Sequence, residues 1–376
     1  MKVFLGAPAL LCPLGDDPVK VHQRMLDDES GLSRTDHYGK SVFAGNIGDG
    51  LVQEMPNRTR LESMMIQTIR KSLIGLNGFD VSNTALFICT TKGNIDHIKD
   101  ATDELVGLSR LITVLRDEFK LSNTPQIISH ACISGIVGVV TAARWIKAGN
   151  ADNAIVVGGD LASEFTLSGF LSLHAVSGER CKPYDKNRDG INLGEAAASL
   201  VLSKDKVVFK DDSWIYSAGN VTNDANHISG PSRTGEGLYR SITKTLNKAE
   251  NAEFDFISAH GTGTVFNDEM ESIAFDRSGI SSKPIHSLKW YLGHTLGAAG
   301  LIETVIGLEC LRTGQIIKSG GFKEEGTSKR LNVVQPEERH FDSAQGDGLE
   351  EGQLNSFLKT ASGFGGCNAS ILISNE

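Results

Sequence analysis

The chain has 376 residues, of which 40% are hydrophobic and 22% are charged, and its formal net charge is −9. This length allows one large domain or two closely packed halves. A general nucleic-acid binder is not expected, because neutralising phosphates requires a basic surface. No apolar stretch reaches the roughly 20 residues that cross a bilayer, so we expect no membrane span.

The N-terminal residues 3–14 allow two interpretations. Met1 and Lys2 before an apolar run resemble a short signal peptide. Pro8 and Pro13 interrupt that run, however, and favour a first buried strand that turns near Pro13. We prefer the strand.

Apolar runs rich in β-formers alternate with helix-like segments along the rest of the chain. The pattern predicts strands at 85–90, 126–129, 154–158, 214–218, 254–258 and 285–288, and helices at 104–119, 133–148, 237–248, from 268, and 297–311. This alternation indicates an α/β fold with buried, largely parallel strands. The polar stretch 204–212 is the best internal boundary, and residues 319–347 are expected to form a surface excursion.

The cysteines do not form a metal-binding or disulfide pattern. There is no C-x-x-C pair, so neither a zinc ribbon nor a disulfide scaffold is indicated. We therefore expect no metal and a reducing, cytoplasmic location. The six positions are Cys12, Cys89, Cys132, Cys181, Cys310 and Cys367.

Cys132 lies between a predicted strand and a predicted helix, followed by the small residues Ser134 and Gly135. A thiol at a helix N-terminus faces unpaired N–H groups, which lower its pKa and favour the nucleophilic thiolate. An isolated cysteine is more often a buried structural residue, so the local sequence alone leaves both interpretations open.

His260 follows the predicted strand 254–258 in the sequence His-Gly-Thr-Gly-Thr. Ligand sites in open α/β sheets cluster at such strand ends. The glycines allow close approach of a ligand, and Thr262 and Thr264 offer hydroxyls. A structural role for a lone histidine before a glycine turn remains an alternative.

A second histidine follows another predicted strand. Lys289 and His294 precede a helix that carries Glu303. These side chains can form a charge network that orients the imidazole, although an ordinary buried ion pair would look the same. The glycine-rich turn around Phe364, before a final strand, fits a backbone N–H donor to an oxyanion better than a phosphate cradle.

Together these stretches resemble the β-ketoacyl-acyl-carrier-protein synthase family, the Cys-His-His condensing enzymes of the thiolase-like superfamily. The resemblance covers residues 125–376 and includes the motifs around Cys132, His260, His294 and Phe364, and residues 182–195. It implies an α/β, thiolase-like fold in which two similar βα halves, 1–208 and 209–376, form α/β/α/β/α layers. The first half would carry the nucleophile and the second both histidines.

The resemblance also implies roles for individual residues. Cys132 would accept an acyl group, and neutral His260 and His294 would stabilise the enolate formed when malonyl-carrier protein loses carbon dioxide. The backbone N–H groups of Cys132 and Phe364 would form the oxyanion hole, with Phe364 as the gate. Other positions match residues that tune the second histidine, contact pantetheine or move with the gate: Lys289 and Glu303, Thr262 and Thr264, and Asp224 to His227 respectively.

The implied reaction is a decarboxylative condensation in fatty-acid, polyketide or aryl-polyene-type pigment synthesis. Two alternatives remain: a non-catalytic chain-length partner subunit, and a thiolase-like acyl transferase or hydrolase. No tightly bound cofactor is implied, because the phosphopantetheine arm of the carrier protein delivers the substrate. The implied partners are acyl carrier protein and a second subunit, as a homodimer or a heterodimer with a related synthase or chain-length subunit.

Three departures from the family pattern concern the acyl chain. The chain is short before Cys132, Ser362 stands where the family usually has phenylalanine, and Trp290 and Tyr291 are bulky beside the expected site. We therefore expect a pocket for an unusual acyl chain. Arg58 and Arg60 are candidates for binding the acidic carrier protein, or are merely solvated charges.

Overall fold

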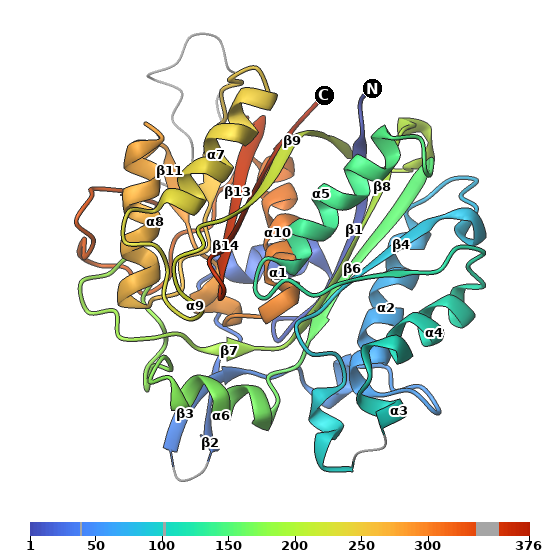
Figure 1. Cartoon of the computed structure of the whole chain (residues 1–376), viewed down its shortest axis with the longest axis horizontal. Helices are drawn as coiled ribbons and strands as arrows, with labels where there is room; N and C mark the ends of the chain where they lie inside the picture. Colours follow the sequence, from blue (N-terminus) through green and yellow to red (C-terminus); the bar gives the residue numbers. More distant parts are fainter. Residues whose placement is uncertain (38–39, 101–102, 336–352) are drawn as a thin grey trace.

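The computed structural model describes residues 1–37, 40–100, 103–335 and 353–376 (Figure 1). An eleven-stranded sheet in the order β12-β11-β10-β13-β14-β9-β1-β8-β6-β4-β5 runs through the molecule, and β2, β3 and β7 form a second, small sheet. The strands of the first half are β1 (Phe4–Leu11), β2 (Ser33–His37), β3 (Lys40–Gly45), β4 (Ala85–Cys89), β5 (Gln126–Ile128), β6 (Asn153–Asp160), β7 (Leu193–Gly194) and β8 (Ala196–Ser203). Those of the second half are β9 (Ser213–Asn223), β10 (Phe256–Ser258), β11 (Pro284–His286), β12 (Asn332–Val333), β13 (Ser356–Gly363) and β14 (Cys367–Ser374).

The helices are also divided between the two halves of the chain. The first half contains α1 (Pro18–Leu26), α2 (Arg60–Ile74), α3 (Asp103–Val106), α4 (Leu108–Phe119), α5 (Ser134–Lys147) and α6 (Glu164–Ser172). The second contains α7 (Glu236–Lys248), α8 (Val265–Arg277), α9 (Lys289–Leu292) and α10 (Ala299–Thr313). Within the described residues, no helix has the length and apolar character that crossing a membrane requires.

The two halves of the large sheet have the same strand order. Strands β1, β4, β5, β6 and β8 are arranged as β5-β4-β6-β8-β1, and β9, β10, β11, β13 and β14 as β11-β10-β13-β14-β9. Each equivalent pair of neighbours also has the same parallel or antiparallel sense. The antiparallel pairing of β1 with β9 joins the two arrangements into one sheet. The division of the chain at residue 208 stays a prediction.

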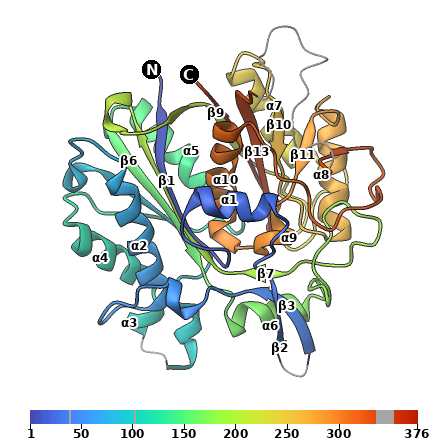
Figure 2. The ribbon, with the colours of Figure 1, turned by 180° about the vertical axis from the view of Figure 1, so that it is seen from behind.

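Side-chain alternation builds the layers. In β4, Phe87 and Cys89 face a central core around α5 and α10, whereas Leu86 and Ile88 face an outer core around α2 and α4. In β13, Phe357 faces the central core, and Leu358 faces the core beneath α7 and α8. Helices α5 and α10 pack against each other and against both halves of the sheet, as Figure 2 shows from behind. The predicted α/β/α/β/α layering is confirmed.

Several sequence predictions need correction. The strands are not largely parallel, because the middle of the sheet, from β13 to β6, pairs antiparallel. Residues 364–366 alone connect β13 to β14, a link too short for the crossover that a parallel pair requires. The predicted helix 104–119 is divided at Gly107 into α3 and α4.

The remaining predictions concern the two ends of the chain. The N-terminal run forms β1, which is paired on both sides, so the strand interpretation is confirmed. The predicted excursion 319–347 is partly wrong, because it contains β12 at the sheet edge with buried Leu331 and Val333. Its remaining residues, 336–347, lie outside the described part of the chain.

Candidate active site

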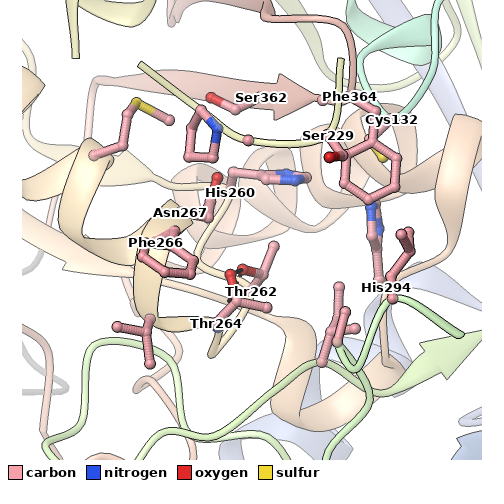
Figure 3. A pocket seen from close by; sticks show the side chains of 18 of the residues that line it. Cys132, Ser229, His260, Thr262, Thr264, Phe266, Asn267, His294, Ser362 and Phe364 are labelled. Atoms are coloured by element: carbon pink, nitrogen blue, oxygen red, sulfur yellow. Dashed lines mark hydrogen bonds between the residues drawn. The ribbon is translucent and has the colours of Figure 1, made fainter. Parts of the chain in front are cut away.

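A cavity of about 460 Å³ lies where strand ends from both halves meet. It is lined by eight of the ten side chains that the sequence singled out for the site: Cys132, Asp224, His227, His260, Thr262, Thr264, His294 and Phe364. Figure 3 shows Cys132, His260 and His294 converging, with Phe364 beside the cysteine. Lys289 and Glu303 are buried and are not among the described residues that line the cavity.

Cys132 is held in a tight turn between β5 and α5. Ala131 adopts a left-handed conformation with φ 47°, which a non-glycine residue adopts only when its surroundings enforce it. Ser134 stabilises the turn, because its hydroxyl accepts from the His130 N–H at 2.8 Å and donates to the Ala131 carbonyl at 2.7 Å. Gly135 permits α5 to approach α10, since a Cβ there would lie 2.8 Å from the Leu301 nitrogen.

The surroundings of the thiol keep it protonated at rest. Burial raises the pKa of Cys132 to about 11, although Lys289, Lys92 and the backbone N–H of Phe364 act to lower it. The prediction that the helix N-terminus lowers this pKa is therefore wrong. The helix begins only at Ser134, and the loss of hydration outweighs the nearby positive charges.

His260 emerges from β10 into a loop that two carboxylates of α8 hold in place. Glu271 accepts from the backbone N–H groups of His260 and Gly261 at 2.9 and 2.7 Å. Asp268 accepts from those of Thr262 and Gly263 at 2.9 and 3.1 Å. These bonds explain how a loop of glycines and threonines is kept in one conformation at the cavity wall.

His294 follows α9 and a glycine with φ 70°. Its backbone N–H donates to the Asn192 carbonyl at 2.7 Å, which ties the turn to the first half of the chain. Neither ring nitrogen of His294 has a hydrogen-bond partner among the described residues, and the same is true of Nδ1 of His260. The two rings meet edge to face, with centroids 5.0 Å apart. Buried imidazoles with free nitrogens can donate hydrogen bonds to a ligand.

Both imidazoles are neutral in this environment. Burial lowers the pKa of His260 well below its ordinary value, and Lys289, His294 and Lys359 lower it further. Burial also lowers the pKa of His294, reinforced by Lys289, Lys92 and Lys359. The expectation of two neutral histidines agrees with these shifts.

The charge network behind the histidines is larger than the sequence suggested. Lys289 forms the expected buried ion pair with Glu303 and donates to the His260 carbonyl at 3.0 Å. Lys359, which the sequence analysis missed, lies 2.7 Å from the other carboxylate oxygen of Glu303. Burial raises the pKa of Glu303, but the two lysines outweigh it and hold that pKa below its ordinary value.

The glycine-rich turn between β13 and β14 lies directly against Cys132. The backbone N–H of Phe364 acts to lower the pKa of the Cys132 thiol, and a side chain at Gly363 would lie 3.1 Å from the Cys132 nitrogen. Glycine therefore leaves the Cys132 N–H open to a ligand. The Phe364 ring is 40% exposed and stacks on Phe170 at 5.6 Å.

Hydrogen bonds connect this turn to the loop that begins at Asp224. The Asp224 N–H donates to the Gly366 carbonyl at 2.8 Å, and the Gly365 N–H donates to the Ile228 carbonyl at 2.7 Å. In the same loop, Nδ1 of His227 accepts from two backbone N–H groups. The two segments that the sequence analysis associated are thus in direct contact.

The other predicted positions have separate environments. Thr262 and Thr264 share a hydroxyl hydrogen bond of 2.8 Å at the cavity wall (Figure 3). Ser362 lines the cavity and donates to Asn368 at 2.8 Å. The expectation that Trp290 and Tyr291 shape the site is wrong, because neither is among the described cavity residues. Tyr291 is fully buried in the core, and Arg180 packs over the Trp290 ring.

The two arginines proposed for carrier binding already have partners. Arg58 lies 3.7 Å from Glu118, and Arg60 lies 3.0 Å from Glu195. Neither is among the described residues that line the cavity. Their role in carrier binding stays a prediction.

Comparison with known families adds independent information. Residues 116–207 match the model of the beta-ketoacyl synthase N-terminal domain, and residues 215–323 match that of its C-terminal domain. The chain is 28% identical over 422 residues to the chloroplastic 3-oxoacyl-[acyl-carrier-protein] synthase I of Hordeum vulgare, covering 99% of this chain and 88% of the relative. It is 30% identical over 271 residues to 3-oxoacyl-[acyl-carrier-protein] synthase 2 of Rhizobium meliloti, covering 68% and 61% respectively.

Solved structures share the fold. The ketosynthase ApeO, in complex with its chain length factor ApeC from Xenorhabdus doucetiae, matches with a TM-score of 0.86 and 22% identity, covering 100% of this chain and 98% of that one. The ishigamide ketosynthase/chain length factor matches with a TM-score of 0.84 and 23% identity, covering 100% and 99%.

Proposed function

The chain belongs to the beta-ketoacyl synthase family, and we propose that it condenses an acyl group on Cys132 with malonyl-acyl-carrier protein. One observation carries this proposal: a buried, protonated thiol and two neutral imidazoles with unpartnered ring nitrogens line one cavity. A thiol suits acyl transfer, and neutral imidazoles suit the stabilisation of an enolate.

The first step loads the acyl group. Cys132 attacks the acyl thioester of the carrier, a new thioester forms, and the thiol proton leaves with the released phosphopantetheine thiol. The backbone N–H groups of Cys132 and Phe364 donate to the oxyanion of the tetrahedral intermediate. Thr262 and Thr264 contact the phosphopantetheine arm along the cavity wall.

The second step forms the carbon-carbon bond. The malonyl group loses carbon dioxide, and the N–H groups of His260 and His294 donate hydrogen bonds to the enolate oxygen that develops. The carbanion then attacks the Cys132 thioester, and collapse of the tetrahedral intermediate expels the Cys132 thiolate. The product is a β-ketoacyl group on the carrier protein.

The test of this function is mass mapping of Cys132 after incubation with a panel of acyl-carrier proteins. We expect an acyl adduct on Cys132 that disappears, with release of carbon dioxide, when malonyl-carrier protein is added. Cys132→Ala should remain unlabelled, and Cys310→Ala, which removes a buried thiol on α10, should label normally. A folded wild type that accepts no acyl group would favour a non-catalytic partner subunit. Labelling followed by release of the free acid without carbon dioxide would favour a hydrolase.

The acyl chain is proposed to differ from an ordinary saturated chain. Ser362 contributes a small polar side chain to the cavity wall, where the family usually has phenylalanine. We expect Ser362→Phe to shift the preference toward short saturated chains, measured as relative labelling of Cys132. Equal turnover of saturated and polyunsaturated or aromatic chains by the wild type would contradict this part of the proposal.

The partners follow from the same function. The carrier protein is one, and a second subunit, identical or a related chain-length subunit, is the other. The similarity to ApeO, solved with its chain length factor, supports the second. All six cysteines are free and buried, which supports a reducing location such as the cytoplasm.

A further inference from the structure

Lys359 occupies an unusual position on the strand that leads to the gate. It lies in β13, its side chain is fully buried, and its register partner in β10 is Ser258. Its ammonium donates to the carbonyls of Ser258 and Ala259 at 3.0 and 3.1 Å. A buried cation is costly unless it is paired, and the carboxylate of Glu303 supplies the pair at 2.7 Å.

One carboxylate therefore holds two lysines. Glu303 pairs through Oε1 with Lys289 and through Oε2 with Lys359. Lys289 donates to the His260 carbonyl at 3.0 Å. Three successive carbonyls, ending at His260 itself, thus accept from lysine ammoniums that share one counter-ion.

From this arrangement we propose that Lys359 is a positioning residue that fixes the end of β10 and thereby the His260 imidazole. The proposal rests on the condensing function proposed above. Lys359 touches neither the cavity nor a reacting atom, and it acts through His260. Because β13 ends at Gly363, directly before Phe364, the same lysine also connects the gate strand to the histidine.

The charge of Lys359 also acts on both imidazoles. Two lysines and one carboxylate give the cluster of Lys289, Glu303 and Lys359 a net positive charge. Burial lowers the pKa of Lys359 below its ordinary value, although Glu303 acts to raise it. The pKa values of His260 and His294 are lowered first by burial and then by charges that include Lys359.

The other charged groups around the histidines belong to neighbouring elements. The cations are Lys289 of α9 and Lys92, which follows β4, and the carboxylates are Glu303 of α10 and Asp268 and Glu271 of α8. Asp268 and Glu271 are themselves held by backbone N–H groups. Removing Lys359 alone would leave the cluster without net charge, and the histidine pKa values would rise.

The sign of the pH effect follows from this. The neutral imidazole is the active form, so activity is lost as pH falls through the histidine pKa. If that pKa rises, the loss occurs at a higher pH. Lys359→Met should therefore move the acid limb of carbon dioxide release from malonyl-carrier protein upward by about one pH unit.

The experiment compares Lys359→Met with Lys248→Met in the full chain. Lys248 of α7 likewise donates to a strand carbonyl, that of Gly219, but lies outside the cluster. It therefore controls for the loss of a lysine that donates a hydrogen bond to a strand. We expect Lys359→Met to lower the plateau rate of carbon dioxide release about tenfold and to shift its acid limb, whereas Lys248→Met changes neither. Labelling of Cys132 by acyl-carrier protein should be much less affected than decarboxylation.

A second variant guards against a folding defect. Lys359→Arg keeps a cation beside the Glu303 carboxylate, so its acid limb should stay near that of the wild type even if its plateau is lowered. An unchanged acid limb in Lys359→Met, or equal effects of Lys359→Met and Lys248→Met, would overturn the inference. Absence of carbon dioxide release from the wild type would instead overturn the proposed function, so the two failures are distinguishable.

Discussion

The two halves of the sheet have the same strand order but carry different chemistry at equivalent points. The helix α5 follows β5 and begins just after Cys132, whereas its equivalent α10 follows β11, Lys289 and His294. The buried polar side chain of α5 near the nucleophile is Ser134, which is uncharged. In α10 the buried carboxylate of Glu303 lies between two lysines. The helix that follows the nucleophile thus buries no charged side chain, whereas the helix that follows the histidines carries the carboxylate of the charge cluster.

This difference shows how burial serves both halves. Loss of hydration raises the pKa of Cys132 and lowers those of His260 and His294, so all three reacting groups are neutral at rest. The charged cluster of Lys289, Glu303 and Lys359 lies behind the histidines and is not among the described residues that line the cavity. Neutral groups at the surface of the cavity bind a neutral thioester without a fixed charge to desolvate.

The largest expected effect separates the two halves by removing the nucleophile. Cys132→Ala should abolish condensation, because no thioester can form on the first half. It should still release carbon dioxide from malonyl-carrier protein, because both histidines remain in the second half. The measurement is carbon dioxide release alongside product formation, with Cys310→Ala as the matched control. Loss of both activities in a folded variant would contradict the division of labour.

The next effect concerns the nucleophile's protonation. Because burial raises the pKa of Cys132 to about 11, the rate of alkylation by iodoacetamide should rise about tenfold per pH unit, or roughly a thousandfold between pH 7 and pH 10. Mass mapping of the labelled peptide follows the rate at this residue. A plateau near pH 8 would show that the helix N-terminus controls the thiol after all.

Removing one imidazole from the second half should have a smaller effect than the two changes above, and it should act on carbon dioxide release. His294→Ala should slow carbon dioxide release by about a hundredfold or more while Cys132 still accepts an acyl group. His130→Ala, which removes a half-buried imidazole near the nucleophile, should change neither step. Since burial keeps the pKa of His294 well below its ordinary value, the wild-type rate should not decline between pH 8 and pH 6. A decline centred near pH 6.5 would contradict the neutral-imidazole account.

The smallest expected effect concerns the glycine-rich turn of the second half, which lies over the cysteine of the first half. In Gly366→Ala a Cβ would lie 2.0 Å from the Asp224 carboxylate, whereas in Gly365→Ala the nearest atom would be 3.7 Å away. Both positions have positive φ, 70° and 79°, so both variants share the backbone cost of roughly 1–2 kcal/mol. Only Gly366→Ala should also slow acylation of Cys132, by about tenfold. Equal acylation rates in the two variants would show that contact with the Asp224 loop is unimportant.

The sequence predicted much of the site, because its motifs are local. The strand-to-helix turns at Cys132, His260 and His294 each lie within a short segment, and the structure brings all three to one cavity. The thiol pKa could not be predicted this way, since the helix N-terminus is visible in the sequence but the depth of burial is not.

What the sequence missed depends on contacts between distant segments. In the sequence Lys359 is a single lysine within an apolar strand, β13, and its partner Glu303 lies on a different element, α10. The antiparallel middle of the sheet was missed for a similar reason, because strand direction depends on the connections and not on the apolar pattern. Tyr291 was expected beside the site, but packing placed it in the core.

The most direct test of the account is the stoichiometry of a single turnover. Protein carrying one acyl group on Cys132 is mixed with malonyl-carrier protein, and the acyl group, carbon dioxide and β-ketoacyl product are each counted. We expect one carbon dioxide and one β-ketoacyl-carrier product for every acyl group lost from Cys132. Loss of the acyl group as free acid, or carbon dioxide release with the acyl group still on Cys132, would contradict it.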